Sequence, residues 1–274
     1  MRPPRAGRLP RRPRRPRREG GIPLRAVLPN TVTALALCSG LTAIRFAILG
    51  NWEVAVLLVL AAAVFDGLDG KIARLVRAES RFGAELDSLS DAISFGVAPA
   101  LILYLWSLNG LGRFGWMIAL LLALFCALRL ARFNANIDQE HQPHKSAGFL
   151  TGVPAPAGAL LAMTPLYLWL WTGEALLRTP VVIAAWTAFI AVLLISSIAT
   201  FAPAVRIKQR IRFEAVVLLV VFVAALVSAP WPTLALLAIA YLATIPFSVR
   251  SYRRVRRLRA ATPVPTSGPE LPLP

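Results

Sequence analysis

Long apolar runs separated by short polar gaps fill most of the chain. Eight of these runs are each close to the roughly 20 residues that an α-helix needs to cross the hydrocarbon core of a bilayer. They lie at about residues 27–49, 52–74, 86–108, 113–135, 153–172, 180–201, 211–229 and 231–249. The alternation of a β-barrel is absent, and isolated strands could not satisfy their backbone polar groups in lipid. The pattern therefore predicts an all-α integral membrane protein with about eight transmembrane helices.

The composition agrees with this fold class and limits the function. Hydrophobic residues make up 57% of the 274 residues, which is too many for an ordinary soluble domain of this length. The net charge of +17 could suggest nucleic-acid binding, but the basic residues lie in a leading tail and between apolar runs, so we expect no nucleic-acid partner. The two cysteines, Cys38 and Cys126, lie within apolar runs and lack metal-ligand spacing, and we interpret both as core residues.

The basic residues also predict the orientation of the helices. If the N-terminal tail is cytoplasmic, the eight spans place 27 of the 30 Lys and Arg residues on the cytoplasmic side, against Arg45, Arg113 and Arg178 on the other. This is a strong positive-inside bias, and it favours an even number of spans. Both termini are therefore expected in the cytoplasm.

The segments outside the predicted spans are polar. Residues 1–25 contain ten arginines among prolines and glycines, which predicts a disordered cytoplasmic tail. Residues 251–274 form a second tail that is first basic and then rich in proline. The gap at 135–151 holds both histidines, His141 and His144, and such a pair in a polar loop is more often solvated than metal-bound.

One stretch carries far more acid than its surroundings. It holds six of the chain's 13 acidic residues, which are Asp66, Asp69, Glu79, Glu85, Asp87 and Asp91. Carboxylates next to apolar runs are costly unless they are paired, protonated or bound to metal, so an acidic cluster in a membrane protein suggests a functional site. The expected orientation puts this stretch at the cytoplasmic ends of the second and third helices, with a turn at residues 75–82.

Helical spacing brings the four aspartates together. Asp66 and Asp69 share one face of a helix, and Asp87 and Asp91 share a face of the next, which is its antiparallel neighbour. Four converging carboxylates repel one another without a divalent cation, and such oxygen donors suit Mg²⁺, Mn²⁺ or Ca²⁺. The alternative is a set of buried ion pairs with neighbouring basic residues, namely Lys71, Arg74 and Arg77.

The spacing of the stretch is more specific than its charge. It contains Asp66-x-x-Asp69-Gly70-x-x-Ala73-Arg74, then eight residues, then Gly83-x-x-x-Asp87-x-x-x-Asp91. This pattern resembles the signature of the CDP-alcohol phosphotransferase family of integral membrane enzymes. The element Pro29-Asn30-x-x-Thr33 resembles another part of that family, which lies beside the nucleotide.

The resemblance implies roles for these residues. Asp66, Asp69 and Asp87 would bind one or two ions of Mg²⁺ or Mn²⁺, and Asp91 would be a metal ligand or the catalytic general base. The CDP-binding residues implied by the resemblance are Asn30, Thr33, Asp69, Gly70, Ala73, Arg74 and Gly83. The family resemblance also implies a homodimer.

Three further segments are similar to one group within the family, the membrane-bound bacterial phosphatidylserine synthases. They are residues 87–100, residues 128–134 and residues 149–157, in which Ala155 occupies a position that is often serine in this group. The resemblance implies a six-helix catalytic core at 26–210 and two additional helices at 211–250. It also implies a site at the cytoplasmic face of a bacterial inner membrane.

The implied reaction transfers the phosphatidyl group of CDP-diacylglycerol to the hydroxyl of L-serine and gives phosphatidylserine and CMP. Arg129 and Arg132 could clamp the serine carboxylate or a phosphate, or they could equally be basic anchors that reach the membrane interface. A second enzyme of the same family would instead use glycerol 3-phosphate, an inositol phosphate or choline as acceptor. Two other classes remain: a transporter with a carboxylate ion path, and an aspartate-rich membrane prenyltransferase.

Overall fold

The computed structural model describes residues 24–76, 80–135, 149–196, 199–201 and 213–261. Its α-helices are α1 (Leu24–Ile48), α2 (Trp52–Leu75), α3 (Arg81–Asp91), α4 (Ala98–Trp106), α5 (Arg113–Ala135), α6 (Ala155–Ala162), α7 (Thr164–Thr172), α8 (Pro180–Ile195), α9 (Phe213–Ser228) and α10 (Pro230–Ala261). A π-helical turn at Ala92–Val97 joins α3 to α4, and 3₁₀ turns lie at Leu108–Leu111 and Ala175–Arg178. The predicted helical fold class is therefore confirmed.

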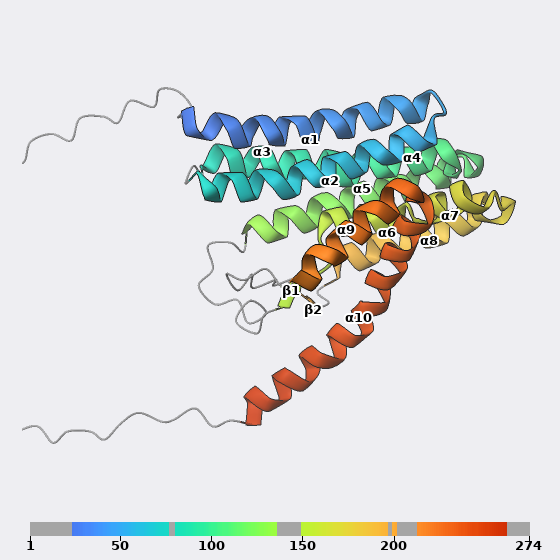
Figure 1. Ribbon diagram of the computed structural model, residues 1–274. Helices are drawn as coiled ribbons and strands as arrows, with labels where there is room; N and C mark the ends of the chain where they lie inside the picture. The colour runs from blue at the N-terminus through green and yellow to red at the C-terminus, as the bar shows by residue number, and fades with distance from the viewer. Residues whose placement is uncertain (1–23, 77–79, 136–148, 197–198, 202–212, 262–274) are drawn as a thin grey trace, which may run out of the picture.

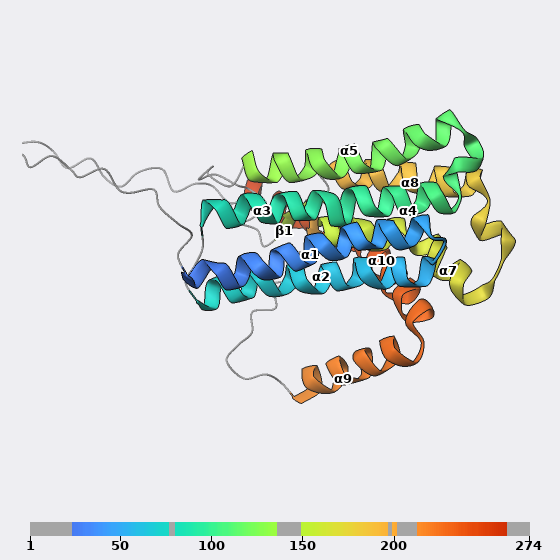
Figure 2. The ribbon, with the colours of Figure 1, turned by 90° about the horizontal axis from the view of Figure 1, so that it is seen from above.

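The long helices form a bundle with two distinct ends (Figures 1 and 2). The start of α1, the end of α2, the start of α3 and the end of α5 lie together at one end, which we call the aspartate end. The end of α4, the start of α5 and the start of α8 lie at the other, which we call the far end. Helix α1 packs most extensively against α2. Small residues such as Ala43 and Ala62 are buried in the bundle core, and they let helix backbones approach closely.

Several helices are long and apolar enough to cross a membrane. Four such segments occur among the described residues: Val27–Ile48, Arg81–Trp106, Arg113–Ala135 and Pro230–Ser248. Two further apolar helices, Pro180–Ile195 and Val216–Ser228, are shorter. The chain is thus a helical membrane protein, whereas the number of eight spans and the side of each terminus stay predictions.

Several of the predicted runs differ from the helices. The run at 153–172 is not one continuous helix, because the helix is interrupted at Met163 between α6 and α7. Pro165 follows this break and has no N–H to continue the hydrogen-bond ladder. The run at 180–201 ends early, because α8 stops at Ile195. The third helix begins at Arg81 rather than at residue 86, because Ser80 caps it.

Two strands of three residues each were not predicted. Strand β1 (Phe149–Thr151) pairs antiparallel with β2 (Ala199–Phe201), and Leu150 lies opposite Thr200. Helix α10 contacts β2. The pairing joins the segment before α6 to the segment after α8, which are distant in sequence.

The last helix extends beyond the predicted span. We expected the helix to end at residue 249, but α10 continues to Ala261 through the basic segment. This segment lacks glycine and proline, and its six arginines, two alanines and one leucine favour a helix. The tail expected at 251–274 is therefore helical over its first part.

The two cysteines differ in environment. Cys126 is buried, as predicted for a core residue. A Cβ at Gly96 would lie 3.1 Å from the Cβ of Cys126, so α5 passes close to the π-helical turn. Cys38 is exposed on α1, so its interpretation as a core residue is wrong. His141 and His144 lie outside the described residues.

Candidate active site

The hairpin of α2 and α3 brings three aspartates together. Ligand oxygens of Asp66, Asp69 and Asp87 all lie within 4.8 Å of one another. Asp69 is buried, and the other two are half-buried. The start of α3 is fixed by Ser80, whose hydroxyl accepts a hydrogen bond from the Gly83 N–H at 3.0 Å. The cap therefore sets where α3 begins and places Asp87 opposite the end of α2.

Basic residues on α2 do not neutralise this cluster. Arg74 is exposed and donates its Nε–H to the carbonyl of Gly70, one turn earlier in its own helix, at 3.0 Å. Within the described residues, neither Arg74 nor Lys71 forms an ion pair with the three carboxylates. Arg77 lies outside those residues. Like charges at such distances repel one another strongly where solvent is partly excluded, so the arrangement favours a bound cation over the ion-pair alternative.

Asp91 lies one turn after Asp87 but outside the group of three. Its carboxylate interacts electrostatically with those of Asp66 and Asp87. Its Oδ1 atom is buried and has no hydrogen-bond partner. An unpaired buried oxygen of this kind is costly unless a ligand completes its contacts.

The backbone changes directly after Asp91. The π-helical turn begins at Ala92, and in it the N–H of Ala98 donates to the carbonyl of Ile93. Pro99 follows and has no N–H, so the regular helical ladder is interrupted near this point. Such π-helical turns often occur at functional sites.

Helix α1 holds the cluster through polar contacts. The hydroxyl of Thr33 donates to Oδ2 of Asp69 at 2.6 Å, and both residues are buried. Ser90 donates to the carbonyl of Thr33 at 3.3 Å, and Ser94 donates to the carbonyl of Ala36 at 3.2 Å. The first bond joins α1 to α2 and fixes the orientation of the Asp69 carboxylate, and the other two join α1 to α3 and to the π-helical turn.

Other residues expected at the nucleotide lie on both sides of the hairpin. The Nδ2 of Asn30 is buried without a hydrogen-bond partner, and a Cβ at Gly83 would lie 3.0 Å from Asn30 Oδ1. On α2, Ala73 is half-buried, and Gly70 is exposed with no atom within 4 Å of a Cβ built on it. The structure thus brings Asn30 next to Gly83 and leaves open space at Gly70.

The two arginines of α5 have different surroundings. Arg129 is half-buried, its Nε has no hydrogen-bond partner, and its charge interacts with Asp91. Arg132 donates from Nη2 to the carbonyl of Ile195 at 2.8 Å, at the end of α8. Arg132 therefore caps a helix C-terminus, while Arg129 lies beside the aspartates.

Comparison with known proteins identifies the family. A family model described as CDP-alcohol phosphatidyltransferase matches residues 26–195, which contain all four aspartates. The chain belongs to the CDP-alcohol phosphatidyltransferase family. A second model, described as CDP-alcohol phosphatidyltransferase 2, matches residues 210–246. The family resemblance predicted from the aspartate spacing is therefore confirmed.

Curated members of the CDP-alcohol phosphatidyltransferase family share extended similarity with the chain. The chain is 41% identical over 228 residues to the CDP-diacylglycerol–serine O-phosphatidyltransferase of Mycobacterium tuberculosis. The matched region covers 83% of this chain and 79% of the relative. The same enzyme of Mycobacterium leprae is 40% identical over 228 residues, which make up 83% of this chain and 76% of the relative. The enzyme of the same name from Methanocaldococcus jannaschii is 43% identical over 139 residues, which make up 49% of this chain and 57% of the relative. A transporter or a prenyltransferase no longer fits these findings.

The sequence did not predict two polar contacts of this CDP-alcohol phosphatidyltransferase. Asn134 donates from Nδ2 to the hydroxyl of Ser88 at 2.8 Å, which ties the end of α5 to α3 beside Asp87. The hydroxyl of Ser90 donates to the carbonyl of Thr33, as described above. Both serines lie between Asp87 and Asp91, so their sequence position was a signal, but their partners required the packing of three helices.

The residues present fit a divalent metal. Three carboxylates offer hard oxygen donors within reach of one ion. Asp91 Oδ1 adds a buried acceptor without a partner close to them. Members of the CDP-alcohol phosphatidyltransferase family generally use divalent metals, and the cluster is the part of the described chain that could bind one.

Proposed function

We propose that this chain transfers the phosphatidyl group of CDP-diacylglycerol to the hydroxyl of L-serine and produces phosphatidylserine and CMP. The observation that carries the proposal is the 41% identity over 228 residues with a curated CDP-diacylglycerol–serine O-phosphatidyltransferase. The family match over residues 26–195, which include the aspartates, supports it. The acceptor follows from these relatives, whereas the aspartates alone are compatible with any acceptor of the family.

Asp66, Asp69 and Asp87 would hold one or two ions of Mg²⁺ or Mn²⁺, because their oxygens converge within 4.8 Å. A divalent ion at this position would neutralise charge on the pyrophosphate of the donor and on the departing CMP. Thr33 orients Asp69 through its hydrogen bond of 2.6 Å. Helices α1 and α2 thus hold Asp66 and Asp69 in the site, and α3 supplies the third carboxylate.

Asp91 is the proposed general base. It takes the proton from the serine hydroxyl as the serine oxygen forms a bond to the β-phosphorus of CDP-diacylglycerol. The bond from this phosphorus to the bridging pyrophosphate oxygen breaks, and CMP leaves with that oxygen. The position of Asp91 outside the group of three supports a role at the acceptor, next to the metal cluster. A role as a fourth ligand is the alternative.

The nucleotide would bind across the hairpin. Gly70 offers open space on α2, and Asn30 offers an unpartnered amide N–H group beside Gly83. Buried amide donors without partners suit the oxygens of a nucleotide. Ala73 and Arg74 lie one turn beyond the aspartates and complete this side, with Arg74 as an exposed positive charge.

Arg129 is the better candidate for the serine carboxylate. Its guanidinium is half-buried and near Asp91, and its Nε lacks a partner. A guanidinium binds a carboxylate through paired hydrogen bonds. Arg132 already donates to a carbonyl at the end of α8, so we expect it to hold α5 against α8 and not to bind the substrate.

The remaining proposals concern the setting of the enzyme. We infer eight spans with both termini in the cytoplasm, a catalytic core at 26–210 and two additional helices at 211–250. The site would then lie at the cytoplasmic face of a bacterial inner membrane, where serine is available. The charge distribution supports this orientation, and the family resemblance favours a homodimer.

The proposal is tested with purified full-length protein in detergent, CDP-diacylglycerol, Mn²⁺ and labelled L-serine. We expect CMP release that depends on serine, together with labelled phosphatidylserine. Asp66→Asn is the matched control, because it keeps the size of the side chain and removes one charge of the cluster. CMP release with glycerol 3-phosphate, an inositol phosphate or choline, but not with serine, would reassign the acceptor.

Metal dependence needs a separate measurement. We expect a chelator to abolish serine-dependent CMP release and added Mg²⁺ or Mn²⁺ to restore it. If CMP release persists in the presence of the chelator, the proposed role of the three aspartates is wrong.

A further inference from the structure

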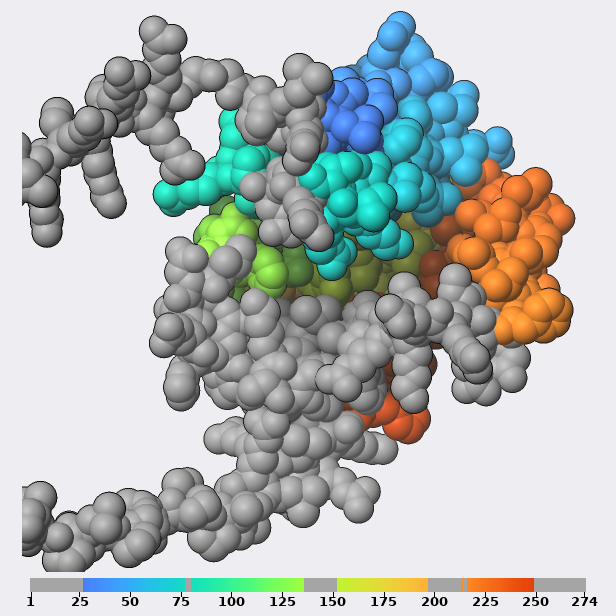
Figure 3. All heavy atoms as spheres, turned by 60° about the vertical axis from the view of Figure 1, so that its left-hand side comes forward, coloured from blue at the N-terminus to red at the C-terminus, as the bar shows by residue number. Residues whose placement is uncertain are grey.

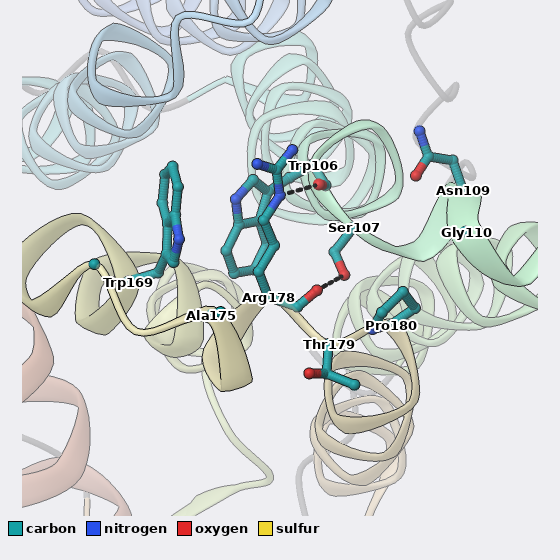
Figure 4. A pocket seen from close by; sticks show the side chains of 10 residues that line it. Trp106, Ser107, Asn109, Gly110, Trp169, Ala175, Arg178, Thr179 and Pro180 are labelled. Atoms are coloured by element: carbon teal, nitrogen blue, oxygen red, sulfur yellow. Dashed lines mark hydrogen bonds between the residues drawn. The ribbon is translucent and has the colours of Figure 1, made fainter.

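A pocket with a charged residue in its wall lies at the far end of the bundle (Figure 4). It has a volume of about 570 Å³ and opens between the end of α4, the 3₁₀ turn at Ala175–Arg178 and the start of α8. Fifteen helical residues separate Asp91 from Trp106 in the pocket wall, a rise of roughly 22 Å along the bundle. This pocket is therefore distinct from the aspartate site.

Arg178 is held in place in this pocket. Its Nε–H donates to the carbonyl of Trp106 at 3.1 Å, and its own carbonyl accepts a hydrogen bond from the Ser107 hydroxyl at 2.7 Å. Its guanidinium carbon lies 5.4 Å from the centre of the Trp169 ring, within the range of a cation–π interaction. Figure 4 shows Trp169 opposite Arg178 and the two hydrogen bonds. The guanidinium is thus oriented before any ligand binds.

The pocket has donors without acceptors. Arg178 is exposed, and within the described part of the chain no hydrogen bond involves its two terminal nitrogens, Nη1 and Nη2. Trp106 is only 1% exposed, and its indole Nε1 is buried without a hydrogen-bond partner. An indole N–H can only donate, so its missing partner must be an acceptor. The free Nη1 and Nη2 donors of Arg178 in the pocket wall therefore suit a ligand with acceptor oxygens.

The charge of the pocket points to an anion. Arg178 is the one charged residue in its wall, and the other polar side chains there are neutral, such as Asn109 and Thr179. Glu174 precedes the 3₁₀ turn but does not line the pocket. Guanidinium groups bind phosphate through paired hydrogen bonds, and the volume exceeds that of a bare ion.

The surroundings favour a ligand in the membrane. Trp171 and Leu176, on either side of Gly173 in the sequence, are 59% and 70% exposed. Exposed tryptophan and leucine at the end of a membrane bundle are typical of contact with lipid near the interface. We propose that the pocket around Arg178 binds a phosphate group of the kind that membrane phospholipids carry, at the end of the bundle opposite the aspartates.

The test measures thermal unfolding of the full-length protein in detergent with two probes, dioleoyl-phosphatidylglycerol and inorganic phosphate. We expect the lipid to raise the Tm of the wild type by about 2–4 °C at saturation. Arg178→Gln should abolish this increase, and Arg178→Lys, which keeps the charge but not the paired donors, should retain part of it. Arg113→Gln is the matched control, because Arg113 is an exposed arginine at the same end that does not line the pocket.

The outcomes are distinct. An increase with lipid that Arg178→Gln abolishes and Arg113→Gln retains supports a phospholipid site. An equal increase with inorganic phosphate alone supports the phosphate chemistry but assigns the pocket to a soluble phosphate compound. If Arg178→Gln and the wild type respond equally, or if Arg113→Gln loses the response as well, the proposal is wrong. Serine-dependent CMP release is not part of this readout, so the result is independent of the proposed reaction.

Discussion

Helices α3 and α9 are both short, yet their surroundings are opposite. Helix α3 carries Asp87 and Asp91 and is joined to α1 by the hydrogen bond from Ser90. Helix α9 is almost entirely apolar, and its consecutive residues Leu218, Leu219, Val220 and Val221 are 69%, 61%, 61% and 58% exposed. Four consecutive residues cover the whole circumference of a helix, so no face of α9 at this level is buried in the bundle. Figures 2 and 3 show α9 at the edge of the molecule.

This difference shows where the chain depends on exact positions. In a bilayer, apolar side chains can face lipid at little cost, so the exposed surface of α9 needs no protein partner. Polar groups in the bundle must instead be satisfied by particular atoms. Small changes near α3 should therefore have large effects, and larger changes on α9 should have small ones.

The largest effect is expected at Asp91. Asp91→Asn keeps the shape of the side chain but cannot accept the serine proton, so kcat should fall about 10²–10⁴-fold. Binding of CDP-diacylglycerol in the presence of Mn²⁺ should persist. Both are measured on purified protein, by serine-dependent CMP release and by titration calorimetry.

The calorimetry separates the two roles of Asp91. If Asp91→Asn loses metal-dependent binding of CDP-diacylglycerol, Asp91 is chiefly a metal ligand and the proposed base is wrong. Asp87→Asn is the matched comparison one turn earlier, and for this variant we expect loss of binding as well as of turnover.

The next effect is expected at Thr33. Thr33→Val removes the donor to Asp69 Oδ2 with little change of volume, so Asp69 loses its orientation. Loss of such a supporting hydrogen bond typically costs 10–100-fold in metal affinity or activity. The measurement is the Mn²⁺ concentration that gives half-maximal CMP release. Thr33→Ser keeps the hydroxyl and should restore most of the affinity, and equal losses in both variants would contradict a role through the hydrogen bond.

A smaller effect is expected at Gly70. No protein atom lies within 4 Å of a Cβ built on Gly70, so Gly70→Ala should not lower the Tm, and alanine favours a helix by about 0.5–1 kcal/mol. If CDP-diacylglycerol occupies this space, the added methyl should raise its KM several-fold while kcat changes little. Gly67→Ala is the matched control, because its Cβ also meets nothing within 4 Å and Gly67 has no proposed contact with the nucleotide. Equal KM values for Gly70→Ala and the wild type would remove Gly70 from the site.

The sequence predicted the aspartate end better than the rest of the molecule. Residues at spacings of three and four share a helix face, so the cluster of Asp66, Asp69 and Asp87 followed from spacing and a short turn. The contact between Thr33 and Asp69 did not, because it depends on how α1 packs against α2. The resemblance indicated Thr33 near the nucleotide, but only the structure shows which atom it contacts.

The errors in the fold have local causes. A long apolar run does not reveal a break, yet Pro165 inside the run at 153–172 was a usable signal for the end of α6. The strands β1 and β2 have three residues each and pair over a long sequence separation, so hydropathy could not find them. Helix α10 continues to Ala261 because its basic segment favours a helix, whereas hydropathy detects only its apolar part.

The smallest effect is expected on α9. Leu218→Ala removes an exposed side chain and leaves no cavity, so the Tm should change by no more than about 2 °C. Leu234→Ala in α10 is the matched control, because Leu234 is 1% exposed and packs in the core, where such a truncation costs about 2–5 kcal/mol. Thermal unfolding in the same detergent measures both variants. A loss at Leu218 as large as at Leu234 would mean that α9 is buried against another protein surface, and the contrast between α9 and α3 would then reflect assembly rather than contact with lipid.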